Sequence, residues 1–388
     1  MKPTLQFSKI LVFLLFGYAS MAQTHNTFYQ SVVDNVSASN ILADLTSFEN
    51  FGVKEVGTTA LTNAENWITS RYQTLGYTVE LQPFTYSAGT SNNIIVTKTG
   101  TVYPNTYIII DGHYDTINGT GTNDNGSGTV LLLEIARLLK EVNTEYSIKF
   151  IHFSGEEDGL IGSNYYVNNT VIPQNLDIRL VFNLDEVGGV NGMVNDTIVC
   201  EEDQSSPPGN NSASSTMTAI LANCIELYSS LNTEISYAYA SDYIPFENNG
   251  EVITGLYEKN ETPHAHTATD LLVNMDPTYL NEVTKGSLGA LLEFAISTNA
   301  LSTEEYASNR VKLYPNPSTI GLINLSINEA SSQKASIEIY DVLGKEVFNK
   351  SGLQTEETIQ LKSLQNGVYV AVIRVGNTVT TKKIILNK

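Results

Sequence analysis

Two kinds of apolar segment alternate along residues 63–300 of this 388-residue chain. Short strand-like runs predict strands at residues 78–84, 93–98, 106–110, 148–153, 179–184 and 252–257. Segments with apolar residues at helical spacing predict helices at residues 128–140, 160–167, 215–231 and 277–297. Apolar strands that alternate with helices indicate an α/β domain. We expect a mixed, mostly parallel sheet covered by helices on both faces.

The pattern changes near the C-terminus. Short β-rich segments are separated there by Gly, Asn and Ser turns, at residues 337–340, 358–361, 368–374 and 382–386. They predict a small all-β sandwich over residues 311–388. A polar linker at residues 301–310 would join it to the α/β domain, which would occupy residues 23–300.

The first 22 residues have the pattern of a signal peptide. Lys2 and Lys9 form a positive region, an apolar run follows at residues 10–16, and small residues Ser20 and Ala22 precede the cleavage point. A buried N-terminal helix or a membrane anchor is the alternative. The run is shorter than the ~20 residues that a spanning helix needs, and no later segment resembles one. We therefore expect an exported chain with no membrane span.

Charge separates the two predicted domains. Residues 23–310 contain 10 basic and 35 acidic side chains, whereas residues 311–388 contain 9 basic and 6 acidic ones. A strongly acidic body argues against nucleic acid or an anionic membrane as partner. Cys200 and Cys224 are too few for a disulfide scaffold or a cysteine-based zinc site. They would form one bridge or remain free, and the sequence favours neither.

Acidic residues and histidines gather in five clusters along the α/β domain. In chain order these are Asp111-Gly-His113-Tyr-Asp115, Asn123-Asp124-Asn-Gly-Ser-Gly128, Gly155-Glu156-Glu157-Asp-Gly-Leu-Ile-Gly-Ser163, Asn183-Leu-Asp185 and Pro263-His264-Ala-His266-Thr-Ala-Thr-Asp270. Taken singly, most are explained by a loop histidine, a capped helix start or a solvated acidic loop. Together they follow strand ends, where open α/β sheets bind ligands. Imidazole and carboxylate groups are ligands that suit Zn²⁺.

In this order the clusters resemble the zinc aminopeptidases typified by secreted bacterial leucine aminopeptidases. Glutamate carboxypeptidases and glutaminyl cyclases are relatives of that family. The resemblance covers about residues 30–300 and implies two zinc ions per chain. It implies that His113 and Asp185 bind one ion and that Glu157 and His266 bind the other, with Asp124 bridging both.

The resemblance also implies the catalytic groups. Glu156 would be the general base, and Asp115 would orient His113. His266 is preferred to His264 as a ligand because it alone begins a His-Thr-x-x-Asp motif. The implied substrates are peptides with a free N-terminus.

The stretch Ser241-Asp242-Tyr243 departs from the family's Ser-Asp-His. We expect Tyr239 or Tyr243 to pack rather than to stabilise an oxyanion. Competing hypotheses are a carboxypeptidase or single-zinc glutaminyl cyclase of the same fold, and a binding module that has lost catalysis. The complete set of ligand residues argues against the binding module.

The tail resembles the C-terminal sorting domain of the type IX secretion system. The resemblance rests on Leu313-Tyr-Pro-Asn-Pro317, Ile339-Tyr-Asp-Val-Leu-Gly-Lys345, Gly367-Val-Tyr369 and the basic-apolar end Lys382-Lys-Ile-Ile-Leu386. It implies secretion machinery as a partner. It also implies a secreted or cell-surface location, reached through the periplasm and outer membrane. A carbohydrate-binding β-module is the alternative.

Overall fold

The structure is a computed structural model that describes residues 23–206, 208–238, 240–296, 311–327, 335–342, 344–375 and 378–388. These residues fall into two compact units that divide after Ile296. The predicted signal peptide (residues 1–22), the predicted linker (residues 301–310) and Tyr239 lie outside the described residues. No helix among the described residues is long and apolar enough to cross a membrane.

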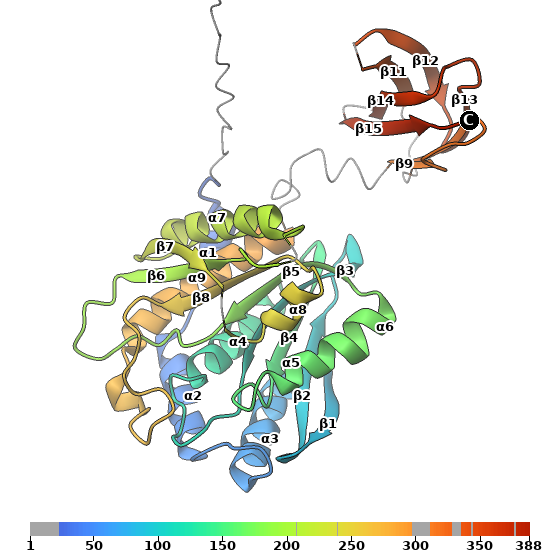
Figure 1. Cartoon of the computed structure of the whole chain (residues 1–388). Helices are drawn as coiled ribbons and strands as arrows, with labels where there is room; N and C mark the ends of the chain where they lie inside the picture. The colour runs from blue at the N-terminus through green and yellow to red at the C-terminus, as the bar shows by residue number, and fades with distance from the viewer. Residues whose placement is uncertain are drawn as a thin grey trace, which may run out of the picture. The chain divides into compact units, whose positions relative to one another are not determined.

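The first unit contains a sheet in the strand order β1-β2-β4-β3-β5-β8-β6-β7 (Figure 1). The strands are β1 (Val79–Tyr86), β2 (Gly89–Lys98), β3 (Tyr103–His113), β4 (Tyr146–Phe153), β5 (Asp177–Leu184), β6 (Thr197–Glu202), β7 (Asn232–Tyr237) and β8 (Ile253–Glu258). The neighbours β4, β3, β5 and β8 run parallel to one another. The pairs β1–β2, β2–β4 and β6–β8 are antiparallel. The predicted mixed α/β sheet is confirmed.

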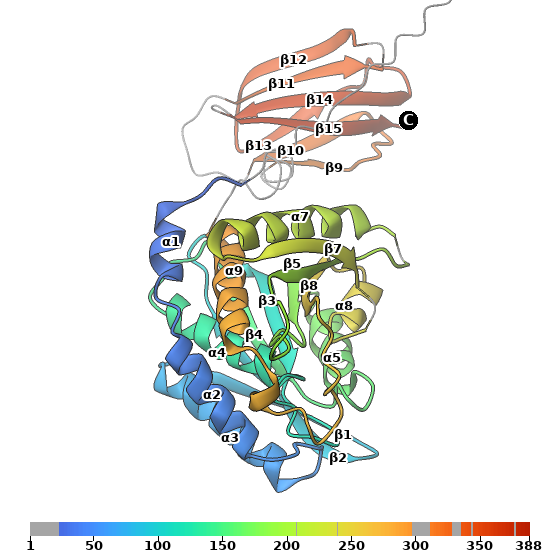
Figure 2. The same cartoon turned by 90° about the vertical axis from the view of Figure 1, so that its left-hand side faces the viewer.

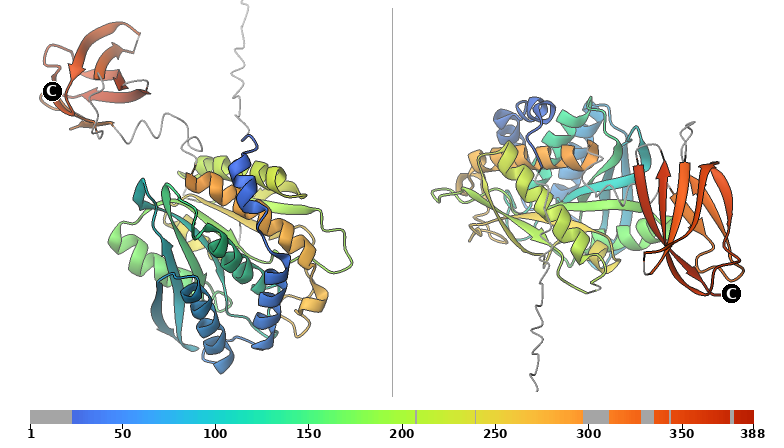
Figure 3. Two further views of the ribbon diagram at one scale, coloured as in Figure 1. Left: turned by 180° about the vertical axis from the view of Figure 1, so that it is seen from behind. Right: turned by 90° about the horizontal axis from the view of Figure 1, so that it is seen from above.

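Helices cover both faces of this sheet (Figure 2). One face carries α1 (Thr27–Val33), α2 (Ala38–Asn50), α3 (Thr59–Thr74), α4 (Gly126–Leu139), α7 (Asn211–Tyr228) and α9 (Pro277–Ile296). Seen from behind, the blue, teal and orange helices of this layer lie side by side (Figure 3, left). The other face carries α5 (Ile161–Tyr166), α6 (Ile172–Gln174) and α8 (Ile244–Asn248).

Burial on both faces explains the apolar strands. Ile109, Ile151 and Val181 pack in one cluster with Tyr166 of α5 and Phe246 of α8. The alternate residues of the same strands face the α4 and α9 side and are equally buried. Consequently the central strands end in loops whose position is set by a core packed on both faces of the sheet.

The second unit is a sandwich of two antiparallel sheets. One sheet has the order β13-β10-β9 and the other β12-β11-β14-β15. The strands are β9 (Val311–Tyr314), β10 (Leu322–Ile327), β11 (Ala335–Asp341), β12 (Glu346–Leu353), β13 (Glu356–Gln360), β14 (Gly367–Val375) and β15 (Thr378–Leu386). Ile323 and Ile359 of one sheet share a core with Ile337, Ile373 and Ile384 of the other. The all-β sandwich expected from the sequence is confirmed.

Several local expectations change with the structure. Strand β3 extends to His113, so this histidine ends the strand instead of lying in a loop. Helices α1 to α3 and the strands β6 and β7 were not predicted. Cys200 and Cys224 are both buried free thiols, which decides against the bridge.

Candidate metal centre

The five residues implied as metal ligands come together at one edge of the sheet. His113 ends β3, Asp185 follows β5, and Glu157 lies in the segment after β4. Asp124 lies two residues before the start of α4, and His266 lies in the segment after β8. Because β4, β3, β5 and β8 are parallel neighbours, their carboxyl ends lie at the same edge. The sheet thus gathers side chains from five distant segments.

A first group of three ligand atoms consists of Nε2 of His113, Oδ1 of Asp124 and Oδ1 of Asp185. The His113 nitrogen lies 3.3 Å from Oδ1 of Asp124 and 3.3 Å from Oδ1 of Asp185. The His113 side chain is 1 % exposed, so water cannot replace these partners. The three atoms are close enough together to hold one cation.

A second group consists of Nε2 of His266, Oδ2 of Asp124 and Oε2 of Glu157. The His266 nitrogen lies 3.1 Å from Oδ2 of Asp124 and 2.7 Å from Oε2 of Glu157. The two oxygens of Asp124 therefore belong to different groups: Oδ1 to the group of His113 and Oδ2 to the group of His266. His264, the other candidate, instead places Nδ1 2.8 Å from Oγ1 of Thr269 and belongs to neither group.

The cluster carries more negative than positive charge. Burial is the largest effect on Asp124 and would raise its pKa, but hydrogen bonds from His113 and His266 outweigh it and lower the pKa. Burial, followed by the charge of Asp124, raises the pKa of Glu157 to about 9. A nearby cation would relieve this repulsion.

Two buried carboxylate oxygens are also suited to bind a cation. Among the described residues, Oε1 of Glu157 has no hydrogen-bond partner, and Oδ1 of Asp185 has none besides its 3.3 Å contact with Nε2 of His113. Unpaired buried oxygens are costly, and coordination to a metal would satisfy them. The donor set of imidazole nitrogens and carboxylate oxygens fits Zn²⁺.

The side chain of Asp115 aligns the two adjacent glutamates. Its carboxylate accepts hydrogen bonds from the backbone N–H groups of Glu156 and Glu157, both at 3.3 Å. His113 instead directs Nδ1 to the backbone carbonyl of Asp115 at 3.1 Å, and the carboxylate Oδ1 is 3.7 Å away. The backbone of Asp115 thus contacts the histidine, while its side chain contacts the Glu156–Glu157 turn.

Glu156 lies beside the first group without belonging to it. Its Oε2 is 3.9 Å from Nε2 of His113, and its side chain is 17 % exposed. Burial is the largest effect and raises the pKa of Glu156 to about 7, with the charge of His113 acting in the opposite direction. A carboxylate in this position and environment can accept and return a proton near neutral pH.

Several supporting residues had no role assigned from the sequence. Asp270 accepts hydrogen bonds from the backbone N–H groups of Asn123 and Asp124 at 2.9 and 3.0 Å. Ser241 donates its hydroxyl to Oδ2 of Asp185 at 2.7 Å. Only the His-Thr-x-x-Asp and Ser-Asp motifs signalled these positions.

Two further residues near the centre are fully enclosed. Buried Lys54 places Nζ within hydrogen-bond distance of the carbonyls of Gly52 and Thr120, which helps to fix the loop before Asp124. Tyr243 is 1 % exposed and packs in the core beside Phe246, as the expected packing role requires.

Two parts of the chain match known protein families. The fold and the carboxylate–histidine cluster at its strand ends are those of a metal-dependent hydrolase. Residues 93–291 match the model of peptidase family M28, and the chain belongs to this family. Residues 312–387 match the model of the secretion system C-terminal sorting domain.

Relatives and solved structures agree with this assignment. The chain is 41 % identical over 113 residues to aminopeptidase YwaD of Bacillus subtilis, a match that covers 29 % of this chain and 24 % of the relative. It is 31 % identical over 172 residues to an aminopeptidase of Pseudomonas aeruginosa, with coverages of 42 % and 30 %. The chain thus spans well under half the length of these relatives.

Two solved structures share the fold. The zinc aminopeptidase BSAP of Bacillus subtilis has a TM-score of 0.59 at 18 % identity, covering 69 % of this chain and 97 % of that one. A glutaminyl cyclase of Macrostomum lignano has a TM-score of 0.63 at 14 % identity, covering 72 % and 96 %. At these identities the likeness concerns the fold alone.

Proposed function

We propose that this protein is a zinc-dependent aminopeptidase that binds two zinc ions and releases N-terminal residues from peptides. The observation that carries the proposal is the position of Asp124 between two histidines. One of its oxygens is 3.3 Å from Nε2 of His113, and the other is 3.1 Å from Nε2 of His266. A carboxylate with one oxygen in each of two ligand groups is suited to bridge two cations.

Each ion has a proposed set of ligands. His113 and Asp185 hold one, Glu157 and His266 hold the other, and Asp124 contributes to both. Zinc, when bound, acts as a Lewis acid that polarises the scissile carbonyl and lowers the pKa of a water. The buried oxygen Oε1 of Glu157, which has no hydrogen-bond partner among the described residues, supports this assignment.

Glu156 performs the proton transfers in this proposal. It accepts the proton of the attacking water and delivers it to the amine that leaves. Hydrogen bonds from the backbone of Glu156 and Glu157 to Asp115 keep the two glutamates in fixed and separate positions.

The tail and the N-terminus have proposed roles in export. Residues 1–22 direct the chain to the periplasm as a signal peptide, and the β unit addresses it to the outer-membrane secretion machinery. The chain would then act at the cell surface or outside the cell.

The competing chemistries of the same fold are less well supported. Relatives with detectable sequence similarity include proteins named aminopeptidases, whereas the glutaminyl cyclase shares the fold at only 14 % identity. A carboxypeptidase would require a free C-terminus in its substrate, and a cyclase would act on N-terminal glutamine.

Substrates with different free ends test the proposal. Aminoacyl p-nitroanilides, their N-acetylated forms and C-terminally free peptides are incubated with the zinc-loaded chain, with and without a chelator. We expect cleavage of the free aminoacyl anilides only, lost with chelator and restored by zinc. Cleavage of the N-acetylated forms, or activity that survives chelation with no metal in the protein, would contradict the proposal.

A further inference from the structure

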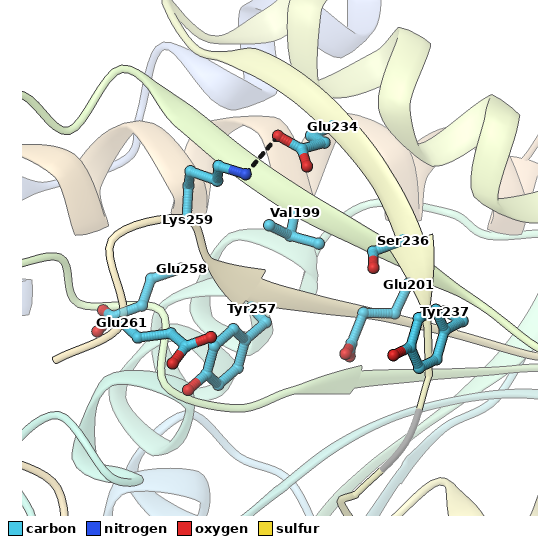
Figure 4. Close-up of a pocket in the computed structure, with 9 residues that line it drawn as sticks. All are labelled: Val199, Glu201, Glu234, Ser236, Tyr237, Tyr257, Glu258, Lys259 and Glu261. Atoms are coloured by element: carbon cyan, nitrogen blue, oxygen red, sulfur yellow. Dashed lines mark ion pairs between the residues drawn. The ribbon is translucent and has the colours of Figure 1, made fainter.

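A cavity linked to the candidate metal centre by hydrogen bonds of Glu258 has no role in the proton transfers described above. Its volume is about 160 Å³, and its lining residues are Val199, Glu201, Glu234, Ser236, Tyr237, Tyr257, Glu258, Lys259 and Glu261 (Figure 4). Most of them come from one face of the adjacent strands β7, β6 and β8. Helix α7 packs on the opposite side of these strands.

Hydrogen bonds connect the cavity wall to the metal centre. The carboxylate of Glu258 accepts both contacts from Nδ2 of Asn123, at 3.0 and 3.1 Å, and Asn123 directly precedes Asp124. The backbone N–H of Glu258 donates to the carbonyl of Glu186 at 3.0 Å, and Glu186 directly follows Asp185. The segment that continues from Glu258 also leads to His266. Glu258 of the cavity wall is therefore hydrogen-bonded to the neighbours in sequence of two candidate ligands, Asp124 and Asp185.

The lining is strongly acidic, with four carboxylates and one ammonium group. Lys259 is paired with Glu234 at 2.6 Å, and both side chains are about half exposed, which places this pair at the rim. Glu258 is occupied by Asn123 and by the backbone N–H groups of Gly189 and Thr262. Glu261 is exposed, so Glu201 is the other buried carboxylate of the lining, and it accepts a hydrogen bond from the side chain of Tyr243.

Glu201 combines burial with access to the cavity. Its side chain belongs to a residue only 5 % exposed, and it lines the cavity beside Tyr237 and across from Tyr257 in Figure 4. Gly255 leaves room for it, because a Cβ at this position would lie 2.8 Å from Oε2 of Glu201. A carboxylate buried this deeply is stabilised by a cation that enters beside it.

We propose that this cavity receives the side chain of the substrate's N-terminal residue and selects lysine and arginine. The aromatic rings of Tyr237 and Tyr257 contact the methylene stem, and Glu201 accepts hydrogen bonds from the terminal ammonium or guanidinium group. This inference rests on the proposed aminopeptidase function. It names the substrate class of that site.

Matched substrates isolate the charge of the side chain. Lysyl and norleucyl p-nitroanilides have stems of equal length and differ in the terminal ammonium group. We expect kcat/KM for the lysyl substrate to exceed that for the norleucyl substrate by at least about tenfold, and the arginyl substrate to behave like the lysyl one. Equal values, or a preference for norleucine, would overturn the proposal.

Glu201→Gln tests the residue itself. We expect this variant to lower kcat/KM for the lysyl substrate by at least about tenfold and that for the norleucyl substrate by less than about threefold. Zinc content is measured in the same preparation. Glu202→Gln is the matched control, because Glu202 is the next residue on β6 and does not line the cavity. An equal loss with both substrates would mean that Glu201 recognises the common α-ammonium group, which also contradicts the proposal.

Binding measurements separate this inference from the aminopeptidase proposal. Calorimetric titration of the zinc-loaded chain with lysinamide and norleucinamide needs no turnover. Tighter binding of lysinamide, lost in Glu201→Gln, would support the cavity's role even if no anilide were cleaved, and only the proposed function would then fail. Equal binding of the two amides would refute the cavity's role even if both anilides were cleaved.

Discussion

The two compact units of this chain bury different kinds of residue. The α/β unit encloses many ionisable groups, including Asp111, His113, Asp124, His152 and Asp242. In the described part of the β unit, the buried residues are apolar with the single exception of Ser318. Burial of charge costs free energy unless partners or cations compensate for it. The ionisable interior therefore marks the unit that contains the candidate site, whereas the interior of the other unit is built from apolar packing.

The strands show the same contrast. In β10 and β11 buried and half-buried residues alternate, which is typical of a sandwich with one face towards solvent. In β5 six consecutive residues are buried, because helices cover both faces of the sheet. Only the second arrangement creates a strand end that is enclosed enough to hold buried carboxylates. This comparison leads to four predictions, from the largest expected effect to the smallest.

The largest effect is expected at the adjacent glutamates. Glu156→Gln should lower kcat by about 10²–10⁴-fold, because it removes the proton acceptor while keeping the side-chain shape. Zinc content, measured by elemental analysis, should stay at the wild-type level. Glu157→Gln should instead lose zinc, because Oε2 of Glu157 lies in the second ligand group. Identical zinc content and activity in the two variants would show that these roles are wrongly assigned.

The shared ligand should affect more metal than an unshared one. Asp124→Asn should reduce zinc at both sites, whereas His266→Ala should leave about one zinc per chain, since only one ligand group contains His266. Asp158→Asn is a control, because this carboxylate is exposed and belongs to neither group. It should retain two zinc ions. One zinc in the dialysed, fully active wild-type chain would contradict the two-metal proposal.

A smaller effect is expected from His152, which is buried on β4 with Nε2 2.9 Å from the hydroxyl of Tyr72. Burial lowers the pKa of His152 to about 3, and its ordinary value is about 6.5. Between these values the unfolded chain binds an additional proton. The free energy of unfolding should therefore fall by up to about 1.4 kcal/mol per pH unit below pH ~6.5 and be unaffected by this group above it.

His152→Gln should remove this dependence. Between pH 7 and pH 5 the variant should lose about 2 kcal/mol less stability than the wild type, whatever its absolute stability. Urea unfolding followed by the fluorescence of Trp67 measures it, because this single tryptophan lies in α3 of the α/β unit. Parallel pH slopes in the two proteins would mean that His152 accepts a proton within the fold.

The smallest effect on hydrolysis is expected from removal of the β unit. A chain that ends at Asn309 should fold, bind zinc and keep its kcat/KM, because the candidate ligands and the cavity all lie before residue 297. In the native host the same truncation should leave the enzyme in the periplasm. Normal secretion of the truncated chain would show that the tail is not a sorting signal. Loss of activity in the purified chain would show that the β unit supports the active site.

The sequence predicted the central sheet well because its strands are continuously apolar. Strands such as β5 are buried on both faces, so their residues form a continuous apolar run that can be recognised in the sequence without knowledge of the fold. By contrast, β7 was missed because its residues are exposed or half-buried and show no apolar run. In α2 and α3 burial depends on contacts with α4 and the β1–β2 pair, which the local sequence does not specify.

In the candidate site, too, some features could be predicted from the sequence and others could not. The residue types and order of His113, Asp124, Glu157, Asp185 and His266 could be recognised along the chain, since each belongs to a local motif. Their supporting contacts could not. The hydrogen bonds that Asn123 donates to Asp270 and to Glu258 join residues 147 and 135 positions apart. Such pairings are set by the packing of the elements around them.

By itself, then, the sequence determined the α/β class, the β-rich tail, the charge difference between them and the order of the motif residues. These depend on local composition and on hydrophobic periodicity, both of which are readable without contacts. Only the tertiary structure decided that the two oxygens of Asp124 face different histidines and that a residue of an acidic cavity, Glu258, is hydrogen-bonded to Asn123 beside Asp124. The physical reason is that both features arise where the edges of several strands meet, and the meeting of distant segments is fixed by how the whole sheet packs.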